Sequence, residues 1–286
     1  MLSHKSFVLS ASFPSSKLSL SNFEHALHRL DPYHFSTIEY YCEGIAPGQV
    51  RSALGEKIGI FLAAAREKSQ NLLPSSTNPE QRNLAVRELV DCMHFAAEAG
   101  SKAVLFNSGL RPSNKDEEQE ALKCFEESII AMHLAEPDLE LLLEPGDRDV
   151  EYRHLIGPIP QAAEFVSQLR SKGLPIGLTF DISHVAQLGE SVDSSWKSAK
   201  NVSRHIHLAN CVLNKASPIY GDKHPLFGIK DSVYQHEDAK KILSMLSQDP
   251  SPLTVGIEMI CPPNESEDTF FQRFVQETAW FFEATF

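Results

Sequence analysis

Short apolar runs recur along the whole chain, and longer segments with the spacing of amphipathic helices separate them. A run of about four to eight apolar residues is typical of a buried strand, whereas apolar residues three and four positions apart indicate a helix that packs by one face. The runs lie near residues 5, 36, 57, 101, 138, 175, 203 and 253. This alternation predicts parallel strands, because each helix returns the chain to the start of the next strand.

The helical segments carry start and stop signals. The clearest spans residues 78–100, with Pro79 in its first turn and Gly100 at its end, and residues 160–173 close on a glycine in the same way. No Pro/Gly/Ser-rich linker divides the chain, and it lacks the GxGxxG turn of an open dinucleotide-binding sheet. We therefore predict an α/β fold, a single (β/α)8 barrel that occupies residues 1–286 as one domain.

The last helical segment, residues 267–286, is unusually aromatic. We expect it to pack on the outside of the barrel, because large aromatic side chains are rarely left in water. A subunit interface is the alternative, and it would make the protein a homo-oligomer.

Composition narrows the functional classes. The net charge of −12 argues against nucleic-acid binding, which depends on Lys and Arg. The five cysteines are scattered without a CxxC pair, which favours reduced thiols. No stretch approaches the roughly 18 apolar residues of a membrane span. We expect a cytoplasmic protein without a nucleic-acid or membrane partner.

Four apolar runs in the second half of the chain end in residues that bind metal ions. Glu144 closes LELLLE, Asp181 closes PIGLTFD, His207 lies in SRHIHLAN, and Glu258 lies in LTVGIEM. The ends of parallel barrel strands point into one mouth, so we expect these side chains to converge. Three carboxylates and one imidazole predict a site for one divalent ion, best suited to Mn²⁺ or Mg²⁺, with Co²⁺ or Zn²⁺ as alternatives.

Further polar residues accompany this set. His184 follows the aspartate by three residues, Arg148 follows the first glutamate by four, and Asp222 and His224 form a D-x-H pair in a Pro-containing loop. The D-x-H pair also suits a solvated turn, so its place in the site depends on the fold.

Two candidates lie at earlier strand ends. Glu39, near the end of the second run, is a candidate to bind a substrate hydroxyl, and a lysine partner is the alternative. Asn107 lies at the end of the fourth run and is a further candidate for substrate contact. His205 alternates with His207 along its strand, and we expect its side chain to face the surrounding helices.

The motifs between residues 138 and 260 resemble those of the xylose isomerase-like barrel superfamily. Its members include sugar isomerases, tagatose and psicose 3-epimerases, hydroxypyruvate isomerase, inosose dehydratase and endonuclease IV. The resemblance implies that the four strand-end residues bind one divalent ion and that Glu144 and Glu258 also serve as catalytic acid and base. It implies that His184 and Arg148 contact a small carbohydrate substrate, and we group Asp222 and His224 with them.

The implied reaction is isomerisation or epimerisation of a sugar, keto-sugar or sugar phosphate, by proton transfer through an enediolate. The chain departs from the epimerases after His207, where it has only Lys215 in place of an arginine. A metal-dependent lyase or dehydratase acting on a keto-sugar or inosose therefore stays open, because proton removal next to a carbonyl begins both reactions.

A phosphodiesterase like endonuclease IV is the second alternative. That branch uses the D-x-H pair and His184 to complete a cluster of zinc ions. It also needs two histidines from earlier strands, where this chain places Phe61 and Asn107.

Overall fold

The computed structural model describes residues 2–249 and 253–283, and eight strands within them close into a barrel. Each strand pairs in parallel with the next, and the last pairs with the first. The strands are β1 (Leu2–Val8), β2 (Thr37–Tyr40), β3 (Ile58–Leu62), β4 (Ala103–Phe106), β5 (Glu140–Leu143), β6 (Ile176–Asp181), β7 (Ser203–Leu208) and β8 (Leu253–Ile257). The predicted (β/α)8 fold is confirmed. That one domain fills all of residues 1–286 stays a prediction.

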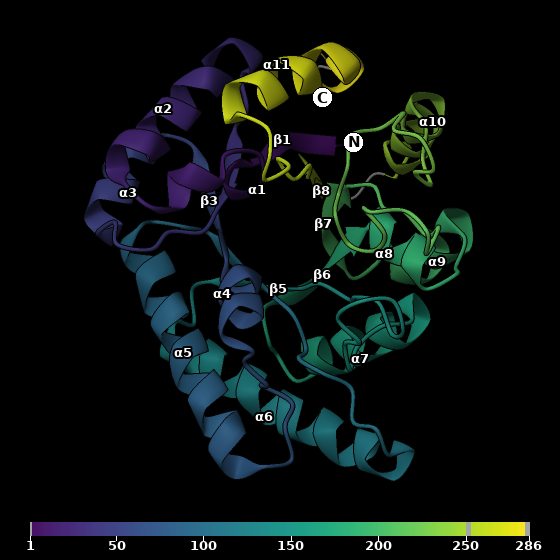
Figure 1. The fold of residues 1–286 in the computed structure, drawn as a ribbon. Helices are drawn as coiled ribbons and strands as arrows, with labels where there is room; N and C mark the ends of the chain where they lie inside the picture. Colours follow the sequence, from purple (N-terminus) through teal and green to yellow (C-terminus); the bar gives the residue numbers. More distant parts are fainter. Residues whose placement is uncertain (1, 250–252, 284–286) are drawn as a thin grey trace.

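Helices surround the barrel (Figure 1). They are α1 (Leu9–Ser12), α2 (Leu20–Leu30), α3 (Pro47–Leu54), α4 (Ala63–Gln70), α5 (Pro79–Glu98), α6 (Glu118–Ala135), α7 (Ile159–Ser171), α8 (Ile182–Gln187), α9 (Val192–Ala199), α10 (His236–Leu246), α11 (Glu267–Glu277) and α12 (Ala279–Phe282). Three short 3₁₀ helices are η1 (Pro14–Lys17), η2 (Asp31–Tyr33) and η3 (Lys115–Glu117). None of the helices in the described part of the chain combines the length and the apolar character that a membrane span requires.

The long helix α5 forms where its sequence signals predict. The side chain of Asn78 accepts a hydrogen bond from the backbone N–H of Glu80 at 2.9 Å, and Pro79 takes the first helical position. Gly100 follows the end of the helix with φ of +76°, a conformation that side chains other than glycine rarely adopt.

Aromatic rings pack the barrel against its helices. The ring centroid of Phe7, in β1, lies 6.0, 5.8 and 6.1 Å from the ring centroids of Phe271, Phe274 and Phe282, respectively. Helices α11 and α12 therefore cover β1 from outside, as the aromatic pattern predicted for the described part of residues 267–286. Residues 284–286 of that segment lie outside the described residues.

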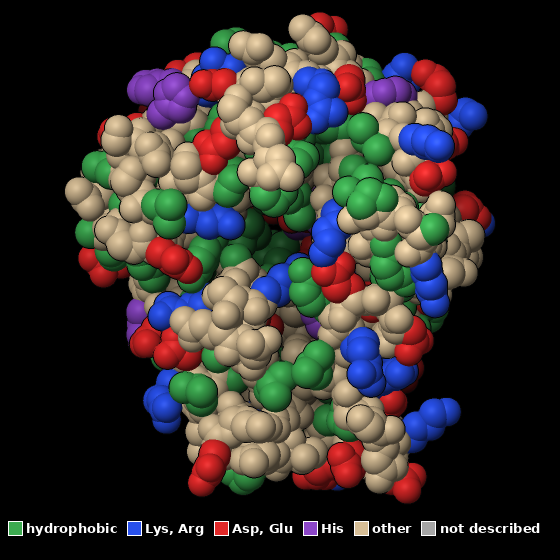
Figure 2. Space-filling model, viewed as in Figure 1, with side chains coloured by type: hydrophobic (Ala, Val, Ile, Leu, Met, Phe, Trp, Pro, Cys, Tyr) green, Lys and Arg blue, Asp and Glu red, His purple; other side chains and the backbone are tan. Residues whose placement is uncertain are grey.

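The carboxyl ends of the strands open onto one face, where the surface is hollowed (Figure 2). A cavity of about 440 Å³ lies there. Val8, Leu62 and Leu105, at or near the ends of three early strands, form part of its wall. Barrel enzymes carry their active sites at this end, so the cavity is the place to look for the predicted site.

Candidate metal centre

Four side chains from the last four strands meet in this cavity. Glu144 directly follows β5, Asp181 ends β6, His207 lies in β7, and Glu258 directly follows β8. One potential ligand atom from each lies within 4.8 Å of those of the others. The structure thus brings together the set that the sequence predicted. Three carboxylates and an imidazole form a donor set that suits a hard or borderline divalent cation.

His207 lies at the centre of the set. Its Nδ1 is 2.9 Å from Glu144 Oε1 and 3.1 Å from Glu258 Oε2. Asp181 Oδ2 is 3.8 Å from the same nitrogen. On the other side of the ring, Nε2 lies 2.7 Å from Glu39 Oε2. A carboxylate that accepts the proton of the far nitrogen leaves the near one free to bind a cation, so Nδ1 is the ligand atom of this histidine.

The two carboxylate oxygens of Asp181 have different surroundings: one caps a helix and the other lies among the candidate metal ligands. Oδ1 accepts hydrogen bonds from the backbone N–H groups of Ser183 at 2.6 Å and His184 at 3.4 Å, and so caps α8. Oδ2 is buried and has no hydrogen-bond partner among the described residues. Buried carboxylate oxygens are normally paired, so an unpartnered oxygen beside three other donors fits a cation site.

The charges of the four residues depend on one another. Burial alone would raise the pKa of Glu144, but the hydrogen bond and charge of His207 lower it to about 2. Burial would lower the pKa of His207, yet Glu39 and Glu258 raise it well above its ordinary value. The pKa of Asp181 is raised, because burial dominates there. The cluster therefore favours a positive charge at its centre.

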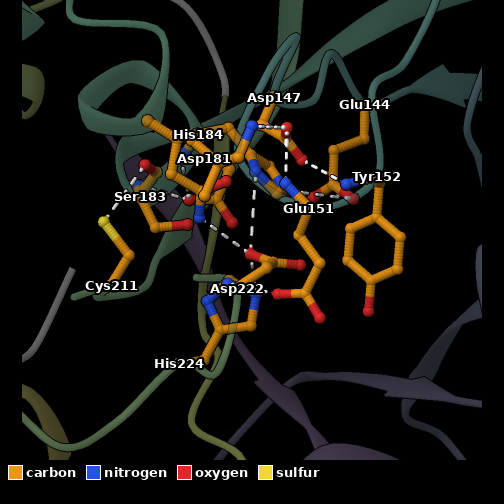
Figure 3. A network of polar contacts seen from close by, with 12 residues as sticks. Glu144, Asp147, Glu151, Tyr152, Asp181, Ser183, His184, Cys211, Asp222 and His224 are labelled. Carbon is orange, nitrogen blue, oxygen red and sulfur yellow. Dashed lines mark hydrogen bonds and ion pairs between the residues drawn. The ribbon is translucent and has the colours of Figure 1, made fainter. Parts of the chain in front are cut away.

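A second layer of polar residues adjoins the ligands, and Figure 3 shows it beside Glu144 and Asp181. Asp222 Oδ1 lies 3.1 Å from His224 Nε2 and 3.7 Å from His184 Nδ1, while His184 Nε2 lies 4.0 Å from Glu144 Oε2. Burial opposes a charge on His184, but Asp222 and the neighbouring carboxylates raise its pKa to about 9. The predicted pair Asp222 and His224 and the predicted His184 therefore lie together beside the metal ligands.

The loop between β5 and α7 folds around Asp147 (Figure 3). Its carboxylate accepts hydrogen bonds from the backbone N–H groups of Val150 at 2.6 Å, Glu151 at 2.9 Å and Tyr152 at 2.7 Å. This turn places Tyr152 in the cavity wall and Glu151 against the backbone N–H of Asp222 at 2.9 Å. The loop thus joins two sides of the mouth.

Arg148, predicted to contact substrate, points away from the metal ligands and toward Leu155 and Glu118. It donates to the backbone carbonyl of Leu155 and lies 3.6 Å from Glu118. The aliphatic part of the Arg148 side chain packs against Gly157, where an added Cβ would lie only 2.5 Å from it. The spacing from Glu144 matches the epimerases, but the turn of the loop directs this side chain toward α6.

Glu39 and Asn107 both lie next to the metal ligands. Glu39 is fully buried beneath His207 and accepts a hydrogen bond from Ser6 Oγ at 2.7 Å, so it supports a ligand and leaves no surface for a substrate hydroxyl. Asn107 Nδ2 donates to the backbone carbonyl of Glu144 at 3.0 Å and lies 3.4 Å from its Oε2.

The expectation for His205 was wrong. It lies two positions before His207, and residues two apart in a strand share a face. The two ring centroids are 4.7 Å apart, and His205 Nε2 lies 3.1 Å from Glu39 Oε2. His205 therefore points into the barrel, where it helps to position Glu39.

Two residues of α4 complete the site, and the sequence did not single them out. Lys68 Nζ lies 3.4 Å from Asp222 Oδ2 and 4.3 Å from the ring centre of Tyr152. Glu67 Oε1 accepts a hydrogen bond from the backbone N–H of Asn107 at 3.0 Å, and burial raises the pKa of this carboxyl to about 8. Their only signal is the position shortly after a strand end, because charged residues on a helix are usually solvated.

Comparison with known proteins agrees with this architecture. A family profile described as "Xylose isomerase-like TIM barrel" matches residues 29–269. Solved structures that resemble the chain include a D-tagatose 3-epimerase-like protein, with TM-score 0.68, 19% identity and 98% of each chain covered. They also include the IOLI protein with a binding zinc atom, with TM-score 0.73, 17% identity and 99% of each chain covered.

A third solved structure is an AP endonuclease, family 2, from Brucella melitensis. It has a TM-score of 0.63 and 13% identity, and the match covers 98% of this chain and 97% of that one. Identities this low establish the shared fold alone. We found no curated protein whose sequence matches the chain.

Proposed function

The chain belongs to the xylose isomerase-like TIM barrel family, and from that premise we propose that it is a divalent-metal-dependent isomerase or epimerase of a sugar, keto-sugar or sugar phosphate. The observation that carries the proposal is the convergence of Glu144, Asp181, His207 and Glu258 beside a cavity of about 440 Å³. Structural neighbours named as a D-tagatose 3-epimerase-like protein and an L-ribulose 3-epimerase support this substrate class.

These four residues are the ones that would hold the ion. Three oxygen donors favour Mn²⁺ or Mg²⁺, and the zinc atom of the IOLI neighbour keeps Zn²⁺ among the candidates. A bound divalent ion polarises a carbonyl oxygen and makes the adjacent C–H bond more acidic.

Glu144 and Glu258 take the proton-transfer roles in this proposal. They follow β5 and β8, which are three places apart around the barrel, so they approach a substrate from different sides. Burial opposes ionisation, yet in the metal-free protein His207 lowers the pKa of Glu144, and His224 and His207 lower the pKa of Glu258, below the ordinary range. A bound cation would act in the same direction, so each is a base at neutral pH. One carboxylate removes a proton next to the carbonyl, and the other returns it.

The surrounding residues orient the substrate and stabilise the negative charge that develops. His184 and His224 face the same space as the ligands and can bind sugar oxygens. Lys68 keeps its proton, because Asp222 raises the pKa of Lys68 against the effect of burial. A fixed positive charge near the developing enediolate lowers the barrier to its formation.

The first test measures metal content on protein purified without chelator, followed by incubation with ketoses in D₂O. We expect about one divalent ion per chain and deuterium on the carbon next to the carbonyl. Both should be lost in Glu258→Gln and kept in Glu265→Gln, a matched change seven residues later at a glutamate that pairs with Arg273 at 2.6 Å. Failure to bind metal after reconstitution would refute the proposal. An irreversible product with new ultraviolet absorbance would identify a lyase.

One observation favours a second candidate, metal-dependent phosphodiester hydrolysis. Asp181, His184 and His224 form another group of potential ligand atoms within 4.8 Å of one another, and one structural neighbour is an AP endonuclease. However, the early strand ends place Leu62 and Leu105 in the cavity wall, and the net charge of −12 opposes a DNA substrate. Two or three zinc ions per chain and nicking of abasic DNA would favour this candidate.

A further inference from the structure

A smaller cavity of about 110 Å³ adjoins the metal centre on the side of the early strands. We call it the side pocket, and its wall includes Glu67, Lys68, Leu72, Asn107, Tyr152 and His154. We propose that the side pocket binds the uncharged, hydroxylated end of the substrate, and so selects a ketose longer than the part held at the metal. This inference rests on the proposed function, because it assumes a substrate anchored by its carbonyl end.

The side pocket adjoins the cavity of the metal centre. Lys68 and Tyr152 line both cavities, so the two share part of their walls. Asn107 lines the side pocket, while its Nδ2 lies 3.0 Å from the backbone carbonyl and 3.4 Å from Oε2 of Glu144. A residue of the side-pocket wall is therefore in direct contact with a metal ligand, and a substrate held at the metal lies close to this wall.

Two buried polar atoms of the side pocket lack partners. Glu67 and Asn107 are 5% and 2% exposed. Oε2 of Glu67 and Oδ1 of Asn107 have no hydrogen-bond partner anywhere in residues 2–249 and 253–283. Buried polar atoms are normally paired with protein or water. Oδ1 of Asn107 can only accept a hydrogen bond, whereas Oε2 of the protonated Glu67 carboxyl can donate one. Hydroxyl groups of a sugar chain both donate and accept hydrogen bonds, so they would satisfy both atoms.

The charges around the side pocket favour a neutral ligand over an anionic one. Its one lysine, Lys68, already lies 3.4 Å from Asp222 Oδ2 and 4.3 Å from the ring centre of Tyr152. Burial raises the pKa of Glu67 to about 8, so its carboxyl adds no negative charge at neutral pH, and the carbonyl oxygen of Asn107 offers no proton to a phosphate. Burial lowers the pKa of His154 to about 4, so its ring carries no charge at neutral pH.

The size of the side pocket limits the length of this end. At about 30 Å³ for each water-sized group, 110 Å³ accommodates roughly three such groups. This volume suits the last two or three hydroxylated carbons of a ketose. Leu72 and Leu73 provide apolar wall against which the carbon atoms of the chain can pack.

The test compares two probes that differ in this end, D-fructose and dihydroxyacetone. Dissociation constants are measured by calorimetry on Mn²⁺-loaded protein, and deuterium exchange is measured separately on the same samples. We expect D-fructose to bind at least about tenfold more tightly than dihydroxyacetone. Leu72→Trp, which fills the side pocket, and Glu67→Leu, which removes its polar atoms, should each reduce this ratio to about one.

Glu67→Gln is the matched control, because its amide oxygen can still accept from the backbone N–H of Asn107. It should keep the preference within about threefold, and all three variants should keep one metal ion per chain. Equal binding of the two probes by the native protein, or a preference that survives both Leu72→Trp and Glu67→Leu, would overturn the proposal. Tighter binding of D-fructose 6-phosphate than of D-fructose, lost in Leu72→Trp, would overturn the neutral class of ligand.

The two proposals fail in distinguishable ways. A length preference in binding without deuterium exchange would refute the isomerase or epimerase reading and leave the side pocket assignment intact. Deuterium exchange with equal kcat/KM for both probes, before and after filling of the side pocket, would refute the side pocket assignment alone.

Discussion

Two buried glutamates, one in each half of the barrel mouth, differ in charge state. Glu144, after β5, has its pKa lowered to about 2, whereas Glu67, in α4 after β3, has its pKa raised to about 8. Burial acts on both in the same direction, so the difference lies in their partners. Glu144 faces the imidazole of His207 at 2.9 Å, while Glu67 accepts a backbone N–H from Asn107. One half of the mouth is organised for a cation and the other for neutral groups.

The two halves also differ in the elements that carry their polar groups. In the late half, from β5 to β8, the four candidate metal ligands stand on the strands or directly after them. In the early half, strand-end residues such as Leu62 and Leu105 are apolar, and Lys68 reaches the cavity from α4. Strands and helices both hold side chains more precisely than loops do, so both halves rest on elements that suit a binding site.

The strongest way to break this comparison is to change a glutamate at each end of the same strand. Glu144→Gln removes a metal ligand and a proton-transfer group, and we expect deuterium exchange into a ketose to fall by about a thousandfold or more. Glu140→Gln, at the opposite end of β5 beside Arg204 at 3.6 Å, should stay within about twofold of the native rate. Metal content is measured on both variants. Equal losses would show that the mouth has no special role.

A second change tests whether the early half also contributes to the metal centre. The carboxylate of Glu39 is hydrogen-bonded to His207 Nε2. Burial would raise the pKa of Glu39, but His205 and His207 lower it below the usual range. Glu39→Gln should weaken Mn²⁺ binding by about 10- to 100-fold, because the partner of a metal-bound histidine fixes its orientation. The measurement is a competition titration with a chelator of known affinity.

The milder change Ser6→Ala serves as the control for this titration. It removes the hydroxyl that donates to Glu39 at 2.7 Å but keeps the carboxylate on His207. We expect a loss of a few-fold at most. An unchanged affinity in Glu39→Gln would mean that His207 is positioned by β7 alone, and the two halves would then be independent.

The fold and the late half could be predicted from the sequence because the signals are local. Eight apolar runs alternate with helices, and in a parallel barrel the strand ends converge, so Glu144 and Glu258 could be placed in one mouth before any coordinates. The family resemblance is likewise confirmed. The prediction for His205 failed because residues two apart in a strand point to the same face, which places His205 on the face of His207.

The early half could be predicted only in part. Glu39 in β2 and Asn107 directly after β4 were candidates, whereas two further polar residues lie in a helix beyond the strand ends. Lys68 and Glu67 occur in the helical run AAAREKSQ, where charged residues ordinarily face solvent. Arg148 has the expected spacing, yet the turn around Asp147 decides where its side chain points. Loop and helix conformations depend on tertiary contacts, so one sequence does not reveal which of their side chains enter a cavity.

The smallest expected effect is a change of thermal stability with pH that depends on the protonation of Glu67. In metal-free protein, the folded chain holds a proton on Glu67 up to about pH 8, while the unfolded chain releases it near the ordinary value of 4.5. Unfolding between these values releases a proton, so rising pH favours unfolding, by at most about 1.4 kcal/mol per pH unit. The stability that the protonated group contributes is complete below pH 4.5 and is lost as pH rises through 8.

Glu67→Gln cannot titrate, so the native protein should lose several degrees of Tm relative to this variant between pH 5 and 8, at roughly 2–4 °C per kcal/mol. Differential scanning calorimetry across this range measures the difference, and parallel curves would mean that Glu67 is ionised in the fold and that both halves of the mouth are negative.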